Sequence, residues 1–107
     1  MLTVTPQEAL EMITAGQAYG VDVRELEEWE SGHFEKFSLN SLSTFDNASL
    51  PTDKPIIFIC RSGNRSKKAC NAVEPTGLKV MNMEGGMLAW QAAGLPMSAA
   101  NGTPEIS

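Results

Sequence analysis

The chain has 107 residues, a formal net charge of −5 at pH 7, and 42% hydrophobic and 20% charged residues. This length predicts one small domain, and the composition is typical of a globular fold. The negative charge argues against nucleic acid as a partner, and no stretch approaches the roughly 18 apolar residues of a membrane span.

Short helices and strands are predicted to alternate along the chain, with turn residues between them. In chain order they are a helix from Pro6 that ends before Gly16, a strand at 19–23, a helix at 25–31, a weak strand at 37–39, one helical turn near 42–45, a strand at 56–59, a helix at 67–73, a strand at 80–83 and a helix at 87–93. The first helix is predicted to start at a capping box, Thr5-Pro6-Gln7-Glu8, and the last strand to end at a tight turn, Glu84-Gly85-Gly86. Such alternation predicts an α/β fold of three layers, with a central, mostly parallel sheet and helices on both faces.

The ends of the chain set the predicted domain bounds and location. We expect residues 1–97 to form the domain and residues 98–107, which are mostly small and polar, to be a flexible tail. The first residues lack the basic and apolar regions of a signal peptide, and two cysteines make no disulfide framework. A reducing, cytoplasmic location is therefore expected.

The most informative stretch is 56–66, where a short apolar run ends at Cys60 and a short loop leads to Ser66, the predicted cap of the next helix. Cys60 is thus expected at the carboxyl end of a strand, where open α/β sheets bind ligands. Backbone N–H groups and the helix dipole favour an anion there. Gly63 and Asn64, which both tolerate positive φ, suit a tight cradle.

Cations gather beside this cysteine. The chain has 8 Lys and Arg residues, and four of them follow Cys60 closely, at Arg61, Arg65, Lys67 and Lys68. Cations and aligned N–H groups lower the pKa of a thiol, so we predict a reactive thiolate, with Arg61 and Arg65 as electrostatic contributors. The alternative is a buried structural cysteine beside a solvated helix face.

Four motifs follow one another along the chain: Asp22-Val23-Arg24-Glu25, then Gly32-His33, then the loop Cys60-Arg61-Ser62-Gly63-Asn64-Arg65-Ser66, then Glu84-Gly85-Gly86 with Trp90 and Gly94-Leu95-Pro96. Together they resemble the rhodanese family over residues 3–97. The resemblance implies a five-stranded parallel sheet flanked by helices. It also implies sulfurtransfer, in which a cysteine takes a sulfane sulfur from a donor such as thiosulfate, becomes a persulfide, and passes the sulfur to cyanide or a thiol.

The resemblance also implies a role for each motif residue. Cys60 is the nucleophile, and the anion cradle comprises Arg61, Ser62, Gly63, Asn64, Arg65 and Ser66. Asp22, Arg24 and His33 match positions that support the fold near the site. We interpret His33 as structural, because it lies far from Cys60 in the sequence and the residues after it depart from the family's usual turn. The expected partners are a small anionic donor and a thiol, cyanide or protein acceptor, with neither metal nor cofactor.

Two other functions compete with this one. Cysteine-based phosphatases and arsenate reductases place an arginine six positions after the cysteine, whereas here Ser66 stands there and the arginine is Arg65. A shorter ring suits a single sulfur atom better than a tetrahedral oxyanion. The domain is alternatively a persulfide carrier or interaction module of a larger system. Cys70 is predicted to be a small buried hydrophobe rather than a resolving thiol.

Overall fold

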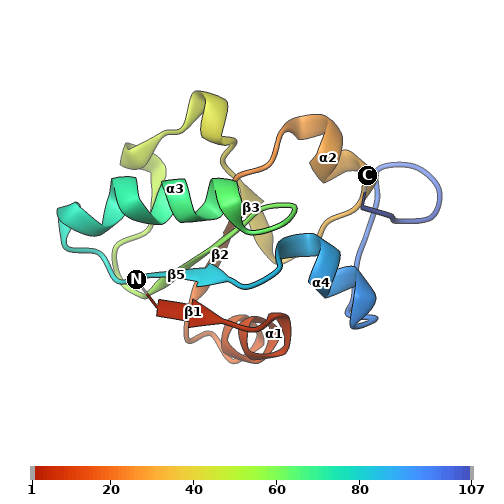
Figure 1. Ribbon diagram of the computed structural model, residues 1–107, viewed down its shortest axis with the longest axis horizontal. Helices are drawn as coiled ribbons and strands as arrows, with labels where there is room; N and C mark the ends of the chain where they lie inside the picture. Colours follow the sequence, from red (N-terminus) through yellow and green to blue (C-terminus); the bar gives the residue numbers. More distant parts are fainter. Residues whose placement is uncertain (1, 107) are drawn as a thin grey trace.

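The computed structural model describes residues 2–106, which form a five-stranded sheet between layers of helices (Figure 1). The strands are β1 (Leu2–Val4), β2 (Tyr19–Asp22), β3 (Phe37–Leu39), β4 (Ile56–Ile59) and β5 (Val80–Met83). They lie in the order β1-β5-β4-β2-β3, and each neighbouring pair is parallel. The predicted three-layer α/β architecture is confirmed, with a sheet that is parallel throughout.

Four α-helices within residues 2–106 cover the two faces of the sheet. They are α1 (Pro6–Thr14), α2 (Leu26–Ser31), α3 (Asn64–Val73) and α4 (Gly86–Ala92). Helices α1 and α4 contact each other and share one half of the core, whereas α3 packs into the other half. In this described part of the chain, no helix is both long and apolar enough to cross a membrane.

Strand β4 lies in the middle of the sheet, and its apolar side chains require helices on both faces of the sheet. Its four residues are all fully buried. Ile57 and Ile59 pack in the half of the core that holds α1 and α4, whereas Ile56 and Phe58 pack with α3. This is the side-chain alternation of a strand whose two faces are both covered, as its continuous apolar sequence predicts.

Strand β1 was not predicted from its local sequence. It has three residues, and only Val4 is buried, so it carries no alternation long enough to indicate a strand. Its backbone pairs in parallel with β5, where Leu2 lies beside Met81 and Val4 beside Met83. Tertiary pairing, rather than local pattern, therefore makes this segment a strand.

The helix starts confirm one prediction and correct two others. Thr5 and Glu8 form the predicted capping box, with the Glu8 N–H donating to Thr5 Oγ1 at 3.1 Å. The cap of α3, however, is Gly63 at φ 108°, and the helix begins at Asn64. Ser66 therefore lies inside the first turn of α3 rather than at its cap. Asn64 is helical, so Gly63 alone supplies the positive φ in this loop.

The C-terminal segment, residues 98–106, runs along α2. Four backbone hydrogen bonds of 2.7–3.0 Å hold it there: Ser98 N–H to His33 O, His33 N–H to Ser98 O, Ala100 N–H to Glu30 O, and Glu105 N–H to Ser31 O. Ile106 also packs at the edge of the core. The flexibility of this segment stays a prediction, and its path beside α2 is set by these contacts.

Candidate active site

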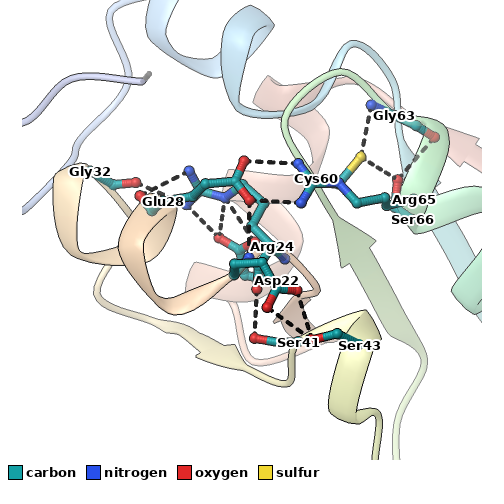
Figure 2. Close-up of polar contacts among 11 residues, drawn as sticks. Asp22, Arg24, Glu28, Gly32, Ser41, Ser43, Cys60, Gly63, Arg65 and Ser66 are labelled. Carbon is teal, nitrogen blue, oxygen red and sulfur yellow. Dashed lines mark hydrogen bonds and ion pairs between the residues drawn. The ribbon is translucent and has the colours of Figure 1, made fainter.

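Cys60 directly follows β4, at the carboxyl end of the middle strand of the sheet. The residue is 1% exposed, and the loop after it folds back over the sulfur. Cys60 Sγ accepts a hydrogen bond from the Gly63 N–H at 2.9 Å and one from Ser66 Oγ at 3.4 Å, as Figure 2 shows. The sulfur is therefore directed into the loop and surrounded by donors.

The outer side of the loop is held by the start of α4. The Met87 N–H donates to Cys60 O at 2.8 Å, and the Leu88 N–H donates to Arg61 O at 3.0 Å. These bonds satisfy two loop carbonyl groups and tie the loop to α4. Gly86 permits this approach: a Cβ there would lie 2.4 Å from Cys60 O, and its φ is +58°. The turn at Glu84-Gly85-Gly86 was predicted, but its contact with the loop was not.

Ser66 joins the sulfur to the neighbouring strand β5. It is fully buried, and its hydroxyl lies within hydrogen-bond range of Cys60 Sγ, Gly63 O and Asn82 Oδ1. A hydroxyl has a single proton to donate, so these three acceptors share it. Sequence reasoning missed Asn82, although one polar residue in an apolar strand is a signal for a buried partner.

Hydrogen bonds decide the acidity of the Cys60 thiol. Burial is the largest single influence and acts to raise its pKa. The Ser66 hydroxyl and the backbone N–H groups of Ser66, Gly63 and Ser62 act in the opposite direction, and together they lower the pKa below its usual range. The loop therefore favours the thiolate, and hydrogen bonds rather than cations are the leading reason.

Arg65 extends away from α3 and pairs with Glu28 of α2 (Figure 2). Its two terminal nitrogens donate to the two carboxylate oxygens at 2.7 and 2.8 Å. This hydrogen bonding lowers the pKa of Glu28 to about 2. The predicted electrostatic contribution of Arg65 at the thiol stays a prediction, and the charge of this arginine is compensated by Glu28. Sequence reasoning missed Glu28, which is 37 positions away and carries no local signal.

The remaining loop residues face outward. The side chains of Arg61, Ser62 and Asn64 are exposed, as are those of Lys67 and Lys68 on α3. Of the residues predicted for the cradle, Gly63 and Ser66 donate to the sulfur, and the backbone N–H of Ser62 also lowers the pKa of the thiol. The side chains of Arg61, Ser62 and Asn64 form the outer surface of the loop.

Asp22 and Arg24 form a buried ion pair at the carboxyl end of β2. Both are fully buried, and the Arg24 guanidinium donates to both carboxylate oxygens, at 2.7 Å in the shortest contact. Arg24 also donates to Glu28 O at 3.3 Å and to Gly32 O at 2.8 Å. The pair therefore fixes α2, and with it Glu28, against the sheet. It supports the loop through Glu28 rather than by contacting the sulfur.

His33 lies beside α2, and its contacts are with that helix and the C-terminal segment. Its ring stacks on Trp29 with a centroid distance of 4.0 Å, and Nδ1 lies 2.6 Å from Trp29 O. Its backbone pairs with Ser98. These contacts favour the structural role that we assign to His33.

The other groups considered for chemistry are Cys70 and a metal site. Cys70 is a free, fully buried thiol in α3 and packs with Ala69 and Val73 in the core. Within residues 2–106, no three His, Cys, Asp or Glu side chains are placed to hold a metal ion. The chemistry that this arrangement offers is that of one buried, hydrogen-bonded thiolate.

Comparison with known proteins places this site in a family. The family model described as "Rhodanese-like domain" matches residues 5–93. The chain belongs to the rhodanese-like family. Its fold agrees with a solved rhodanese-related protein from Thermoplasma volcanium, with a TM-score of 0.84 and 27% sequence identity, over 92% of this chain and 98% of that one.

Relatives of known sequence support the same rhodanese-like assignment. YtwF of Bacillus subtilis is 37% identical over 82 residues, which are 75% of this chain and 80% of that protein. Thiosulfate sulfurtransferase GlpE of Actinobacillus succinogenes is 31% identical over 106 residues, 96% of each chain. Relatives differ in how much of their length this chain spans, which is 24% of one and 96% of another. Sulfurtransferase is the activity class that the family and these relatives support.

Proposed function

We propose that this rhodanese-like domain is a sulfurtransferase that carries the transferred sulfur as a persulfide on Cys60. Family membership and relatives named sulfurtransferases support the activity class. The observation that carries the choice of residue is the set of hydrogen bonds at Cys60 Sγ, because donors that stabilise a thiolate also stabilise a terminal persulfide sulfur.

In the first step, the thiol loses its proton to solvent, and Cys60 Sγ attacks the outer sulfur of a donor such as thiosulfate. A new S–S bond forms to Cys60, and the bond between the two donor sulfurs breaks. Sulfite leaves with the electron pair, as a thiolate leaves in thiol–disulfide exchange. The N–H groups around Sγ then face the terminal sulfur of the persulfide.

In the second step, cyanide or a thiolate attacks the outer sulfur of the persulfide. The Cys60 thiolate is now the leaving group, and thiocyanate or a new persulfide is released. A thiol of lowered pKa leaves faster, so the same hydrogen bonds assist both steps. Neither step needs a metal or an organic cofactor. A protein thiol is an acceptor of the same chemical class.

Intact-mass analysis tests this proposal. After exposure to thiosulfate, the protein should gain about 32 Da, one sulfur atom, and lose it again on addition of cyanide. The variant Cys60→Ser should gain nothing, whereas Cys70→Ala should behave as the wild type does. A mass gain in Cys60→Ser, or none in the wild type with any sulfane donor, would overturn the proposal.

A second candidate function is that of a persulfide carrier, and the comparisons support it as an alternative. Because the chain spans only 24% of some relatives, this domain also occurs within longer proteins. A persulfide on Cys60 that no small thiol discharges, but that a protein thiol accepts, would support the carrier. A cysteine phosphatase needs its loop arginine to face an oxyanion, whereas Arg65 faces Glu28. Hydrolysis of p-nitrophenyl phosphate tests that alternative directly.

A further inference from the structure

Glu28 and Arg65 form a paired group at the surface beside the Cys60 loop. The guanidinium and the carboxylate meet through two short hydrogen bonds, of 2.7 and 2.8 Å. The side chains are 32% exposed for Arg65 and 19% exposed for Glu28. A two-bond contact of this kind fixes the orientation of both groups. The pair is therefore neither buried in the core nor freely solvated.

The carboxylate is oriented before it meets Arg65. The Glu25 N–H donates to Glu28 Oε1 at 3.0 Å in the capping box of α2. The backbone of the same residue is bound by Arg24, which donates to Glu28 O. Because Arg24 is itself fixed by buried Asp22, the position of Glu28 is determined by the fold rather than by Arg65 alone.

Arg65 lies in the segment between Gly63 and Ser66, which both donate to Cys60 Sγ, so it is close to the sulfur in the fold. Its pKa is raised first by the hydrogen bond to Glu28, but the charge on Cys60 also contributes. Such attraction is mutual, so the guanidinium also stabilises negative charge at the thiol. With Glu28 attached, the pair has no net charge, and its attraction for an incoming anion is much weaker than that of a free guanidinium.

We propose that Glu28 determines the charge preference of the Cys60 site, because it holds and neutralises Arg65, one of the two loop arginines, which an anionic donor would otherwise engage. This inference rests on the proposed sulfurtransferase function and narrows its substrate class. Sulfane donors of low charge, such as an alkyl persulfide, lose little from the pairing. A dianion such as thiosulfate must compete with the Glu28 carboxylate for Arg65.

Alkylation of Cys60 measures this preference without any sulfur transfer. The thiolate attacks the CH2 carbon of iodoacetamide or iodoacetate, a C–S bond forms, and iodide leaves in both cases. The reagents differ in charge, so the ratio of their rates (iodoacetate over iodoacetamide), read from the mass of the Cys60 peptide, reports anion attraction. In Glu28→Gln the amide still accepts from Arg65 but carries no charge, and the ratio should rise about three- to tenfold at low salt.

Glu27→Gln is the matched control, because it removes the same charge from the neighbouring, exposed position of α2. Its ratio should stay within about twofold of the wild-type value, because an exposed charge is screened by solvent and salt. A rise in Glu28→Gln that is no larger than in Glu27→Gln would overturn the proposal.

A double-mutant cycle separates the pair from its members. Arg65→Gln leaves the Glu28 carboxylate uncompensated, so the ratio should fall below that of the wild type. Glu28→Gln combined with Arg65→Gln replaces one neutral pair by another, so the ratio should return close to the wild-type value. An unchanged ratio in Arg65→Gln, or a gain that persists in the double variant, contradicts the proposal. The measurement on Arg65→Gln tests the proposal even if Glu28→Gln folds poorly.

Steady-state kinetics then link the preference to the donor. In Glu28→Gln the KM for thiosulfate should fall by a factor similar to the change in the alkylation ratio, with kcat within about twofold. A lower kcat at unchanged KM would overturn the proposal. If neither the wild type nor any variant takes sulfur from any sulfane donor while the alkylation cycle behaves as expected, the proposed function fails and the role of Glu28 in anion preference stands.

Discussion

The two cysteines of this chain are both buried, yet their surroundings drive the two thiols in opposite directions. Cys60 is 1% exposed, Cys70 is fully buried, and neither forms a disulfide. Burial raises the pKa of Cys70 to about 11, and the charge of Glu74 adds to the rise. Burial acts on Cys60 in the same direction, but the hydrogen bonds to its sulfur outweigh it and lower its pKa.

Solvent exposure therefore does not distinguish the reactive cysteine, Cys60, from the structural one, Cys70. What distinguishes them is the element that each occupies. Cys60 follows a central strand, where a loop and a helix N-terminus direct donors at its sulfur, whereas Cys70 lies mid-helix among apolar side chains. At Cys70, beyond the first turn of α3, the backbone N–H groups are already bonded along the helix and are not available to a thiolate.

The largest expected effect comes from exchanging the two thiols for inert groups. Cys60→Ser should abolish sulfurtransfer to the background level, because the weakly acidic hydroxyl is not a sulfur nucleophile at neutral pH. Cys70→Ala should keep turnover within about twofold and lose roughly 1 kcal/mol of unfolding free energy. Thiosulfate:cyanide turnover and denaturant unfolding measure the two. Persistent turnover in Cys60→Ser would mean that the nucleophile is misassigned.

The second-largest effect is expected where the start of α4 contacts the Cys60 loop. Gly86→Ala should lower turnover at least tenfold and destabilise the fold by roughly 2–4 kcal/mol, because the new Cβ meets Cys60 O at a site with positive φ. Gly94→Ala is the matched control, since its φ of +69° is similar but a Cβ there meets nothing within 4 Å. It should cost about 1 kcal/mol and leave turnover unchanged. Equal losses in both variants would show that the close approach is unimportant.

A smaller effect is expected when the side-chain donor to Cys60 is removed. Ser66→Ala should raise the pKa of the thiol, because one hydrogen bond to the thiolate is lost. The pH profile of iodoacetamide alkylation should then shift to higher pH, with less thiolate at pH 7. Ser62→Ala, whose side chain is exposed, should leave the profile in place. The same profile for Ser66→Ala and wild type would assign the acidity to the backbone alone.

The smallest effect concerns acid stability at the ion pair beside Cys60. The pKa of Glu28 is held at about 2 in the folded protein, below its ordinary value of 4.5, mainly by the hydrogen bond to Arg65. The stability from this pair is therefore fully present above about pH 4.5 and is lost as the pH falls toward 2. Wild type should exceed Glu28→Gln by up to about 1 kcal/mol at pH 7, and this margin should close near pH 2. A constant margin across that range would contradict the pairing.

Local patterns in the sequence were sufficient for most of the fold. The apolar run at β4, the capping box at Thr5 and the alternation of helices with strands each reflect short-range chemistry, and the structure agrees with them. Strand β1 was missed because its pairing partner, β5, lies at the other end of the chain. The start of α3 was misplaced because Ser66 has the chemistry of a cap, but its hydroxyl is directed at Cys60 and Asn82.

For the active site too, the sequence predicted only the features that depend on residues close together in the chain. A cysteine after a buried strand, followed by a glycine in a short loop, located the sulfur and one of its donors. The partners contributed by other elements were out of reach: Glu28 from α2, Asn82 from β5 and Gly86 from α4. Each belongs to a segment more than fifteen positions from its partner in the loop, so only the folded arrangement reveals it. Counting the cations near Cys60 therefore could not show that Glu28 compensates the charge of Arg65.

The tie between the loop and the start of α4 has a consequence for synthesis of the protein. Met87 and Leu88, which bind the carbonyl groups of Cys60 and Arg61, are translated well after the cysteine itself. We expect a nascent chain that still lacks α4 to have an unshaped loop and a thiol of ordinary acidity. The lowered pKa of the Cys60 thiol would then appear only once α4 has been synthesised and has packed against the loop.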